Sequence, residues 1–133
     1  DIRYQRNRIR HRIIPELEAI NPAVVDAIVR LGSSVNEDVM VISDLTSRTF
    51  DKLVSIDDDE VRISRRALRQ EPLAIQRRLW QRLVSTIDSD LTLTSAHQEQ
   101  LLDIVNTGEK KTFTIKSIKV IAQCDTIKVY CKH

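Results

Sequence analysis

Residues Lys111 to Cys131 read KTFTIKSIKVIAQCDTIKVYC, and this stretch decides the fold class. Apolar and polar residues alternate here, which is the period of a β-strand and differs from the helical spacing of the residues before it. Three such runs predict a small antiparallel meander: Thr112–Ile115, Ile118–Cys124 and Thr126–Cys131.

The same stretch contains both cysteines of the chain. A two-residue turn at Asp125-Thr126 would pair Cys124 with Ile127 and Cys131 with Val120, which places the thiols beyond bonding distance. We therefore expect two unbridged cysteines that act as small apolar residues in strands. Because they lack a CxxC spacing, they suit the reducing cytoplasm, where we expect the protein to reside.

Upstream, the pair Asn21-Pro22 is a typical helix start. Apolar residues then recur every three or four positions at Val24, Ile28, Leu31, Val35, Val39, Ile42 and Leu45. This spacing predicts one long amphipathic helix ending near Leu53, and such a stripe is typical of a helix packed on a core. Two short strands, Leu53–Ile56 and Val61–Ser64, then flank the acidic run Asp57–Glu60. We interpret this run as a solvated hairpin turn, because a calcium loop requires alternating oxygen ligands and a glycine.

Three further helices are predicted from their first residues. Ser64 precedes Arg65–Arg69, Pro72 opens an arginine-rich helix to Val84, and Thr94 precedes Ser95–Asn106 with Gln98 near the capping-box position. We expect Trp80 in the core and His97 exposed without a role. The predicted fold is α+β and mostly helical, with a long amphipathic helix, an arginine-rich helix, a short hairpin and a C-terminal meander.

The first helix is predicted over Ile2–Ile13, with an interruption at Pro15 and a continuation over 16–20. Arg3, Arg6, Asn7 and Arg10 share one face of it. Residues 1–14 carry five arginines against one aspartate, residues 61–84 carry seven arginines against one glutamate, and residues 15–60 carry eleven acids against three bases. Since arginine binds phosphate in bidentate fashion, these blocks favour a nucleic-acid partner. The alternative is that the acids of the middle segment pair with the arginines.

The residue order of the basic segment resembles that of a known family. Arg6-Asn7-Arg8-Ile9-Arg10-His11, followed by Ile14-Pro15-Glu16-Leu17, resembles the segment that closes the catalytic domain of the tRNA(Ile)-lysidine synthetases, and the spacing of Asp1 and Tyr4 also fits. The resemblance implies a PP-loop ATPase that uses ATP with magnesium and L-lysine to convert the wobble cytidine of an isoleucine tRNA to lysidine. The looser pattern of the next hundred or so residues also fits the family.

The nucleotide motif of that family, Ser-Gly-Gly-x-Asp-Ser, does not occur in this sequence. The two glycines, Gly32 and Gly108, are too far apart to form a glycine-rich phosphate loop. We therefore expect a fragment that follows the ATP-binding core and is inactive alone. Residues 1–20 would end the catalytic domain and residues 21–133 would form the tRNA-binding middle domain.

Binding residues are assigned from this resemblance, and no catalytic residue or metal site is expected. The active-site border would comprise Arg6, Asn7, Arg10 and His11, and the tRNA-phosphate contacts would be Arg65, Arg66, Arg69, Arg77, Arg78 and Arg82. Two alternatives remain open: a stand-alone helical nucleic-acid-binding module, and a protein-interaction domain whose long helix forms a homodimer. No run of eighteen apolar residues predicts a membrane span.

Overall fold

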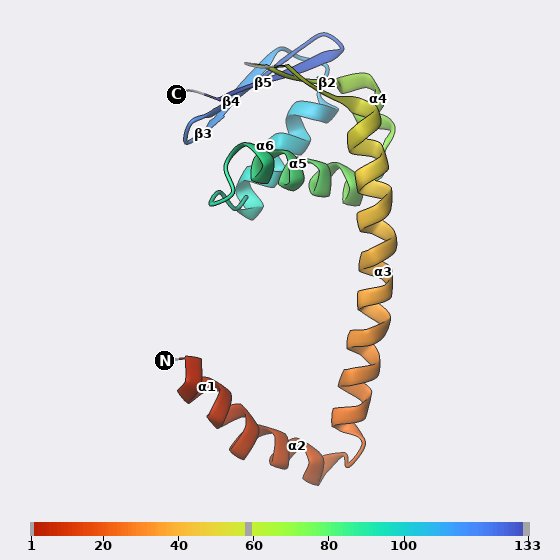
Figure 1. The fold of residues 1–133 in the computed structure, drawn as a ribbon, viewed down its shortest axis with the longest axis vertical. Helices are drawn as coiled ribbons and strands as arrows, with labels where there is room; N and C mark the ends of the chain where they lie inside the picture. The colour runs from red at the N-terminus through yellow and green to blue at the C-terminus, as the bar shows by residue number, and fades with distance from the viewer. Residues whose placement is uncertain (1, 58–59, 132–133) are drawn as a thin grey trace. The chain divides into compact units, whose positions relative to one another are not determined.

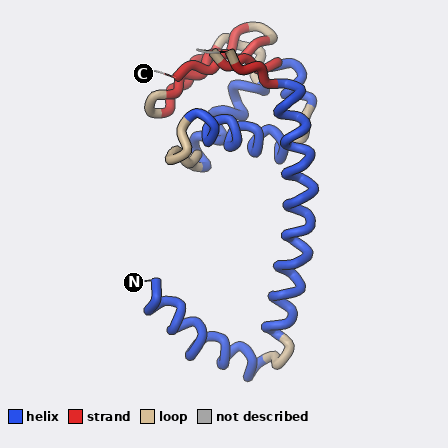
Figure 2. Tube along the Cα trace, viewed as in Figure 1, coloured by secondary structure: helices blue, strands red, loops and turns tan. Residues whose placement is uncertain are grey.

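A computed structural model describes residues 2–57 and 60–131. The chain divides into two compact units, unit 1 (Asp1–Val41) and unit 2 (Ile42–His133), whose helices and strands are shown in Figures 1 and 2. The predicted fold class, α+β and mostly helical, is confirmed. The proposed domain boundary after residue 20 separates the end of a catalytic domain from a tRNA-binding domain. The structure does not test this assignment, so it stays a prediction.

Unit 1 begins with a helix that passes through Pro15. α1 (Ile2–Arg8) leads into a π-helical segment η1 (Ile9–Ile13), and α2 (Ile14–Ile20) follows without a break. The predicted interruption at Pro15 is wrong. The N–H of Ile14 donates to the carbonyl of Ile9, and this wider turn places the proline in the first turn of α2, where a missing N–H costs least.

The long helix α3 (Val24–Leu53) is confirmed, and it continues into unit 2. The side chain of Asn21 accepts the N–H of Ala23 at 3.0 Å just before the helix begins. The expectation of a core-facing stripe is wrong for most of the helix. Its buried side chains are confined to the last two turns, whereas five of the seven stripe residues are exposed: Ile28, Leu31, Val35, Val39 and Leu45. At the start of the helix, Val24, Val25, Ile28 and Val29 line a small apolar pocket with Ile14 and Leu17 of α2, but no described side chain from residue 3 to residue 41 is buried.

Unit 2 contains one five-stranded antiparallel sheet with the order β1-β2-β5-β4-β3. The strands are β1 (Val54–Ile56), β2 (Val61–Ser64), β3 (Lys111–Ile115), β4 (Ile118–Gln123) and β5 (Thr126–Cys131). The predicted hairpin and meander are both confirmed. Pairing of β2 with β5, with Val61 opposite Val129, joins the hairpin and the meander into one sheet, which was not predicted from the sequence. Within the acidic turn, Asp58 and Asp59 lie outside the described residues, as does Asp1 of the basic segment.

Three helices complete unit 2: α4 (Arg65–Gln70), α5 (Leu73–Ile87) and α6 (Ser95–Asn106). Ser64 and Thr94 cap α4 and α6 as predicted, and Pro72 precedes α5. α5 and α6 lie against one face of the sheet (Figure 1) and bury Leu79, Leu83 and Leu101 against the strands. Trp80 is 1% exposed, which confirms its predicted place in the core.

The turn between β4 and β5 lies one residue earlier than predicted, which shifts the register of the two strands by two positions, so Cys131 lies opposite Ile118 and not Val120. Gln123 lies opposite Thr126, so the turn consists of Cys124 and Asp125, and Cys124 adopts a positive φ of 51°. This register keeps the inward-facing residues of both strands on the core side. Both cysteines are exposed, so the expectation of small apolar strand residues is wrong. Both are free, as expected.

His97 is half-buried rather than exposed, and it has a structural role. Its backbone N–H donates to the Thr94 hydroxyl at 3.3 Å, and its ring Nδ1 accepts the Thr94 N–H at 3.4 Å. The ring centroid also lies 6.1 Å from that of Phe113 on β3. His97, and not Gln98, therefore completes the capping box of α6.

Candidate nucleic-acid interface

The basic segment of unit 1 forms a groove on its helical surface. Arg6, Asn7 and Arg10 line this groove of about 530 Å³ together with Arg3, Ile9 and Ile14. The predicted shared face is therefore present. Arg10 lies in the π-helical segment η1, and π-helical turns are frequent at functional sites. Several arginines around one concavity form a surface suited to a polyanion.

His11 lines a different concavity of about 260 Å³, which also contains Tyr4, Arg8 and Arg12. Asn7 is common to both concavities. The four residues predicted to border an active site are therefore all exposed on unit 1. The structure brings three of them together around one groove, and His11 faces the neighbouring one.

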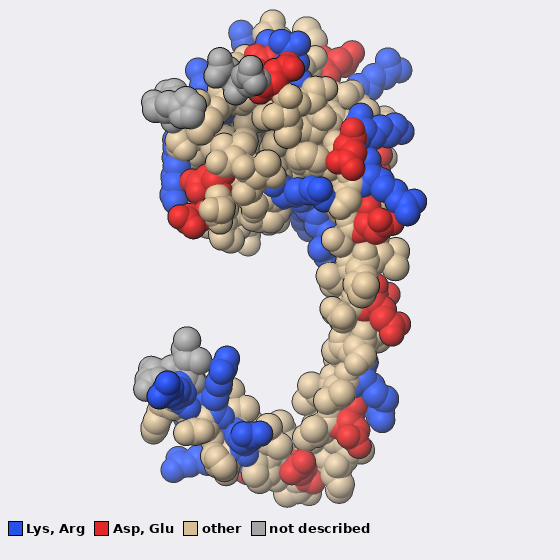
Figure 3. Space-filling view, viewed as in Figure 1, with Lys and Arg blue, Asp and Glu red and all other residues tan. Residues whose placement is uncertain are grey.

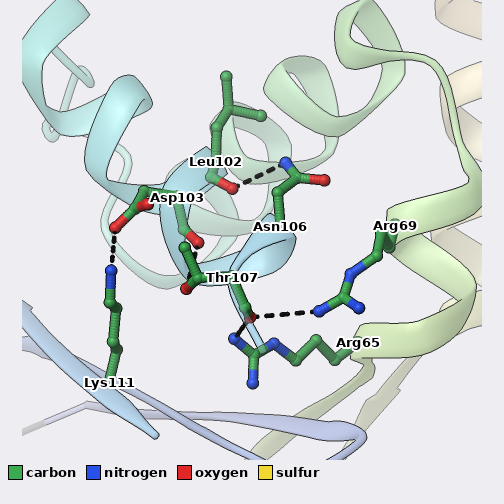
Figure 4. A network of polar contacts seen from close by, with 7 residues as sticks. All are labelled: Arg65, Arg69, Leu102, Asp103, Asn106, Thr107 and Lys111. Atoms are coloured by element: carbon green, nitrogen blue, oxygen red, sulfur yellow. Dashed lines mark hydrogen bonds and ion pairs between the residues drawn. The ribbon is translucent and has the colours of Figure 1, made fainter. Parts of the chain in front are cut away.

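Arg65 and Arg69 of α4 hold the C-terminal end of α6 (Figure 4). Arg65 is 1% exposed and donates to the carbonyls of Thr107 and of Cys124, the latter at 3.3 Å. Arg69 donates to the carbonyls of Val105 at 3.1 Å and Thr107 at 3.2 Å. A cation at these carbonyls satisfies acceptors that the helix leaves open.

This arrangement concerns two residues of the predicted RNA-binding set. Arg65 is buried and committed to backbone carbonyls, so in this conformation it has no access to a phosphate. Arg69 is exposed, but its guanidinium is already used at the end of α6. The burial of Arg65 depends on the pairing of β2 with β5, and that pairing cannot be predicted from the sequence.

The arginines of α5 are exposed on unit 2. Arg77, Arg78 and Arg82 all have exposed side chains, as has Arg66 on α4. Figure 3 shows basic side chains gathered over α5, where it lies beside the last turns of α3. A groove of about 360 Å³ lies there, and its lining is Ser43, Thr46, Arg78, Gln81, Arg82 and Ser85. This lining carries two cations and no carboxylate.

A separate ionic cluster lies on the sheet, and sequence reasoning missed it. Glu60 accepts from the Tyr130 hydroxyl at 2.6 Å, from Arg62, and from the Lys128 ammonium at 3.1 Å. These hydrogen bonds, that of Tyr130 first, lower the pKa of Glu60 to about 2. The hydrogen bond to Glu60 also raises the pKa of Tyr130. The cluster links the start of β2 to β5, and it could not be predicted from the sequence because it depends on the pairing of these two distant strands.

The described residues provide no phosphate loop of the glycine-rich kind. Gly32 lies inside α3 and Gly108 follows α6, so neither occupies a strand-to-helix loop. ATP chemistry is therefore not assigned to these residues. Within residues 2–57 and 60–131, no group of three histidine, cysteine or acidic side chains could hold a metal ion. In the same ranges, no helix is both long enough and apolar enough to cross a membrane.

Comparison with known proteins gives one consistent result. No family model matches the chain. The chain is similar to the tRNA(Ile)-lysidine synthases of Geobacter sulfurreducens (28% identity over 104 residues, 77% of this chain) and Geobacillus kaustophilus (27% over 126 residues, 92%). That of Dehalococcoides mccartyi is 29% identical over 82 residues, or 62% of the chain. The matched regions cover 22%, 27% and 17% of these relatives, so the chain spans about a quarter of their length or less.

Proposed function

We propose that this chain is a segment of a tRNA(Ile)-lysidine synthase and that its unit 2 binds the tRNA. The observation that carries the proposal is the similarity to three proteins of that name, one of them over 92% of the chain. The resemblance of the basic segment Arg6–His11 to that family supports the same proposal. The parent enzyme would use ATP, magnesium and L-lysine to modify the wobble cytidine of tRNA(Ile) in the cytoplasm.

Within this proposal the two arginine surfaces have different tasks. The exposed cations Arg66, Arg77, Arg78 and Arg82 contact phosphates of the tRNA and position it without reading its sequence. Arg6, Asn7, Arg10 and His11 border the active site, which an ATP-binding domain outside this chain would complete. The residues of this chain bind and orient, and the phosphate chemistry belongs to that other domain.

Two measurements test the proposal. The coding region upstream of Asp1 should encode a Ser-Gly-Gly-x-Asp-Ser motif, and the protein that includes it should form lysidine on tRNA(Ile) only with both ATP and L-lysine. The 133-residue chain should bind this tRNA with affinity that falls steeply with salt, and should bind duplex DNA more weakly. An upstream region without the motif, or equal binding to duplex DNA, would favour an independent nucleic-acid module.

A second candidate function has one observation in its favour. The long apolar stripe of α3 is exposed over most of its length. A homodimer formed through this stripe would cover it. The test is the molecular mass across a range of protein concentrations, and a mass that stays monomeric would exclude this candidate.

A further inference from the structure

The groove beside α5 in unit 2 has the chemistry of an anion site. Two of its six lining residues are arginines, three carry hydroxyl groups and one carries an amide. The nearest acid in sequence, Asp44, pairs with Arg48 at 2.8 Å and so has a partner of its own. An oxyanion placed in the groove would meet charged and neutral hydrogen-bond donors together.

Arg82 is held in place before any ligand arrives. Its guanidinium donates to the hydroxyl of Ser47, and its central carbon lies 4.9 Å from the centre of the Phe50 ring. Phe50 is itself 8% exposed, so the ring offers a fixed surface. A guanidinium has five N–H donors, and one bond to Ser47 leaves most of them for a ligand. Because its side chain is already ordered, Arg82 loses less entropy on binding.

Arg78 supplies the second charge. It lies one helical turn before Arg82, on the same side of α5. No acid among the described residues pairs with it, and the repulsion between the two guanidinium groups is relieved by an anion between them. On the next turn, the Ser85 oxygen accepts from Gln81 at 3.2 Å, so the Ser85 hydroxyl hydrogen remains available to donate into the groove.

We propose that this groove binds one phosphate of the RNA backbone, with Arg82 and Arg78 as its ligands and with Ser47 and Phe50 as positioning residues for Arg82. The inference rests on the proposed RNA partner and adds a defined phosphate position to it. A free phosphate or a nucleotide would offer the same chemistry, so the experiment includes both.

The test is a double-mutant cycle on tRNA binding by the full 133-residue chain. The affinity is measured at salt concentrations from about 50 to about 300 mM, so that the salt slope is obtained for each variant. Ser47→Ala should weaken binding about threefold to tenfold, the worth of one hydrogen bond, although no charge changes. In an Arg82→Gln background, Ser47→Ala should have no further effect. The matched control is Arg77→Gln, an arginine of the same helix outside the groove lining, in whose background the full effect of Ser47→Ala should persist.

The outcomes separate this inference from the proposed function. If tRNA binds and Arg77→Gln weakens it, but Ser47 and Arg82 act additively, the phosphate site is wrong and the RNA function stands. If wild-type chain does not bind tRNA, both are wrong. Inorganic phosphate or ATP that binds saturably to wild type and not to Arg82→Gln, and that displaces the RNA, would overturn the RNA backbone as the source of the phosphate.

Discussion

Unit 1 and unit 2 differ in where their apolar side chains lie. In unit 2, the residues on the inner face of the sheet and on α5 and α6 form one buried cluster. In unit 1, no side chain from residue 3 to residue 41 is buried, although apolar residues are as regularly spaced there. Periodicity therefore identifies a helix in both units, but a core forms only where a second layer covers the apolar face.

The largest expected effect is on autonomous folding. A chain shortened to residues 42–133 keeps the whole buried cluster, so it should unfold cooperatively. A peptide of residues 1–41 should be mostly unstructured, because helices without tertiary packing are marginal in water. Circular dichroism of the two pieces checks this, and a stably helical monomeric 1–41 peptide would remove the contrast.

Core truncation should separate the units next. Leu83→Ala removes a fully buried side chain and should cost about 2–5 kcal/mol of unfolding free energy. Leu31→Ala, at a residue 64% exposed, should change stability by less than about 0.5 kcal/mol. Urea titrations of both variants measure the difference, and equal losses would mean that unit 1 is covered in solution.

A smaller effect is expected at the buried arginine of unit 2. Arg65→Ala removes the side-chain donor to the Cys124 carbonyl and one of the two donors to the Thr107 carbonyl, and should cost about 2–4 kcal/mol. Its neighbour Arg66 is exposed, and Arg66→Ala should leave the melting temperature nearly unchanged. If Arg65→Ala were instead stable and impaired in tRNA binding, Arg65 would return to the RNA-contact set.

The smallest effect concerns acid stability within unit 2. Because folding lowers the pKa of Glu60 to about 2, its contribution is complete above the unfolded value of about 4.5 and is lost as the pH falls toward 2. Glu60→Gln should flatten the decline of stability over this range, and Tyr130→Phe should move the decline to higher pH. Melting temperatures between pH 6 and pH 2 give the comparison, and identical profiles for all three proteins would refute it.

Local rules predicted the elements of both units. Side-chain period and the capping residues Ser64, Thr94 and Asn21 identify helices and strands, because those preferences act between near neighbours. These local rules did not predict the π-helical turn before Pro15, since a helix widened by one residue changes the apolar spacing very little.

Contacts between distant residues were beyond the same rules. The pairing of β2 with β5 brings Arg65 within hydrogen-bond distance of the Cys124 carbonyl. The same pairing brings Glu60 to Tyr130 and Lys128. The turn before β5 was misplaced by one residue because both Asp125-Thr126 and Cys124-Asp125 can reverse the chain locally. Both turns place Ile127 and Val129 on the same face of the sheet, so the apolar pattern of the strands does not distinguish them.

The most direct test of the division between the units compares two variants of the proposed parent enzyme, in which an ATP-binding domain would precede this chain. Replacing Arg77, Arg78 and Arg82 by glutamine should weaken tRNA binding by more than about tenfold and lower the salt slope, while the single-turnover rate at saturating tRNA stays near wild type. Replacing Arg6 and Arg10 by alanine should lower that rate more than it lowers tRNA affinity, at an unchanged melting temperature. The same pattern in both variants, or a rate loss that follows the melting temperature, would contradict the account.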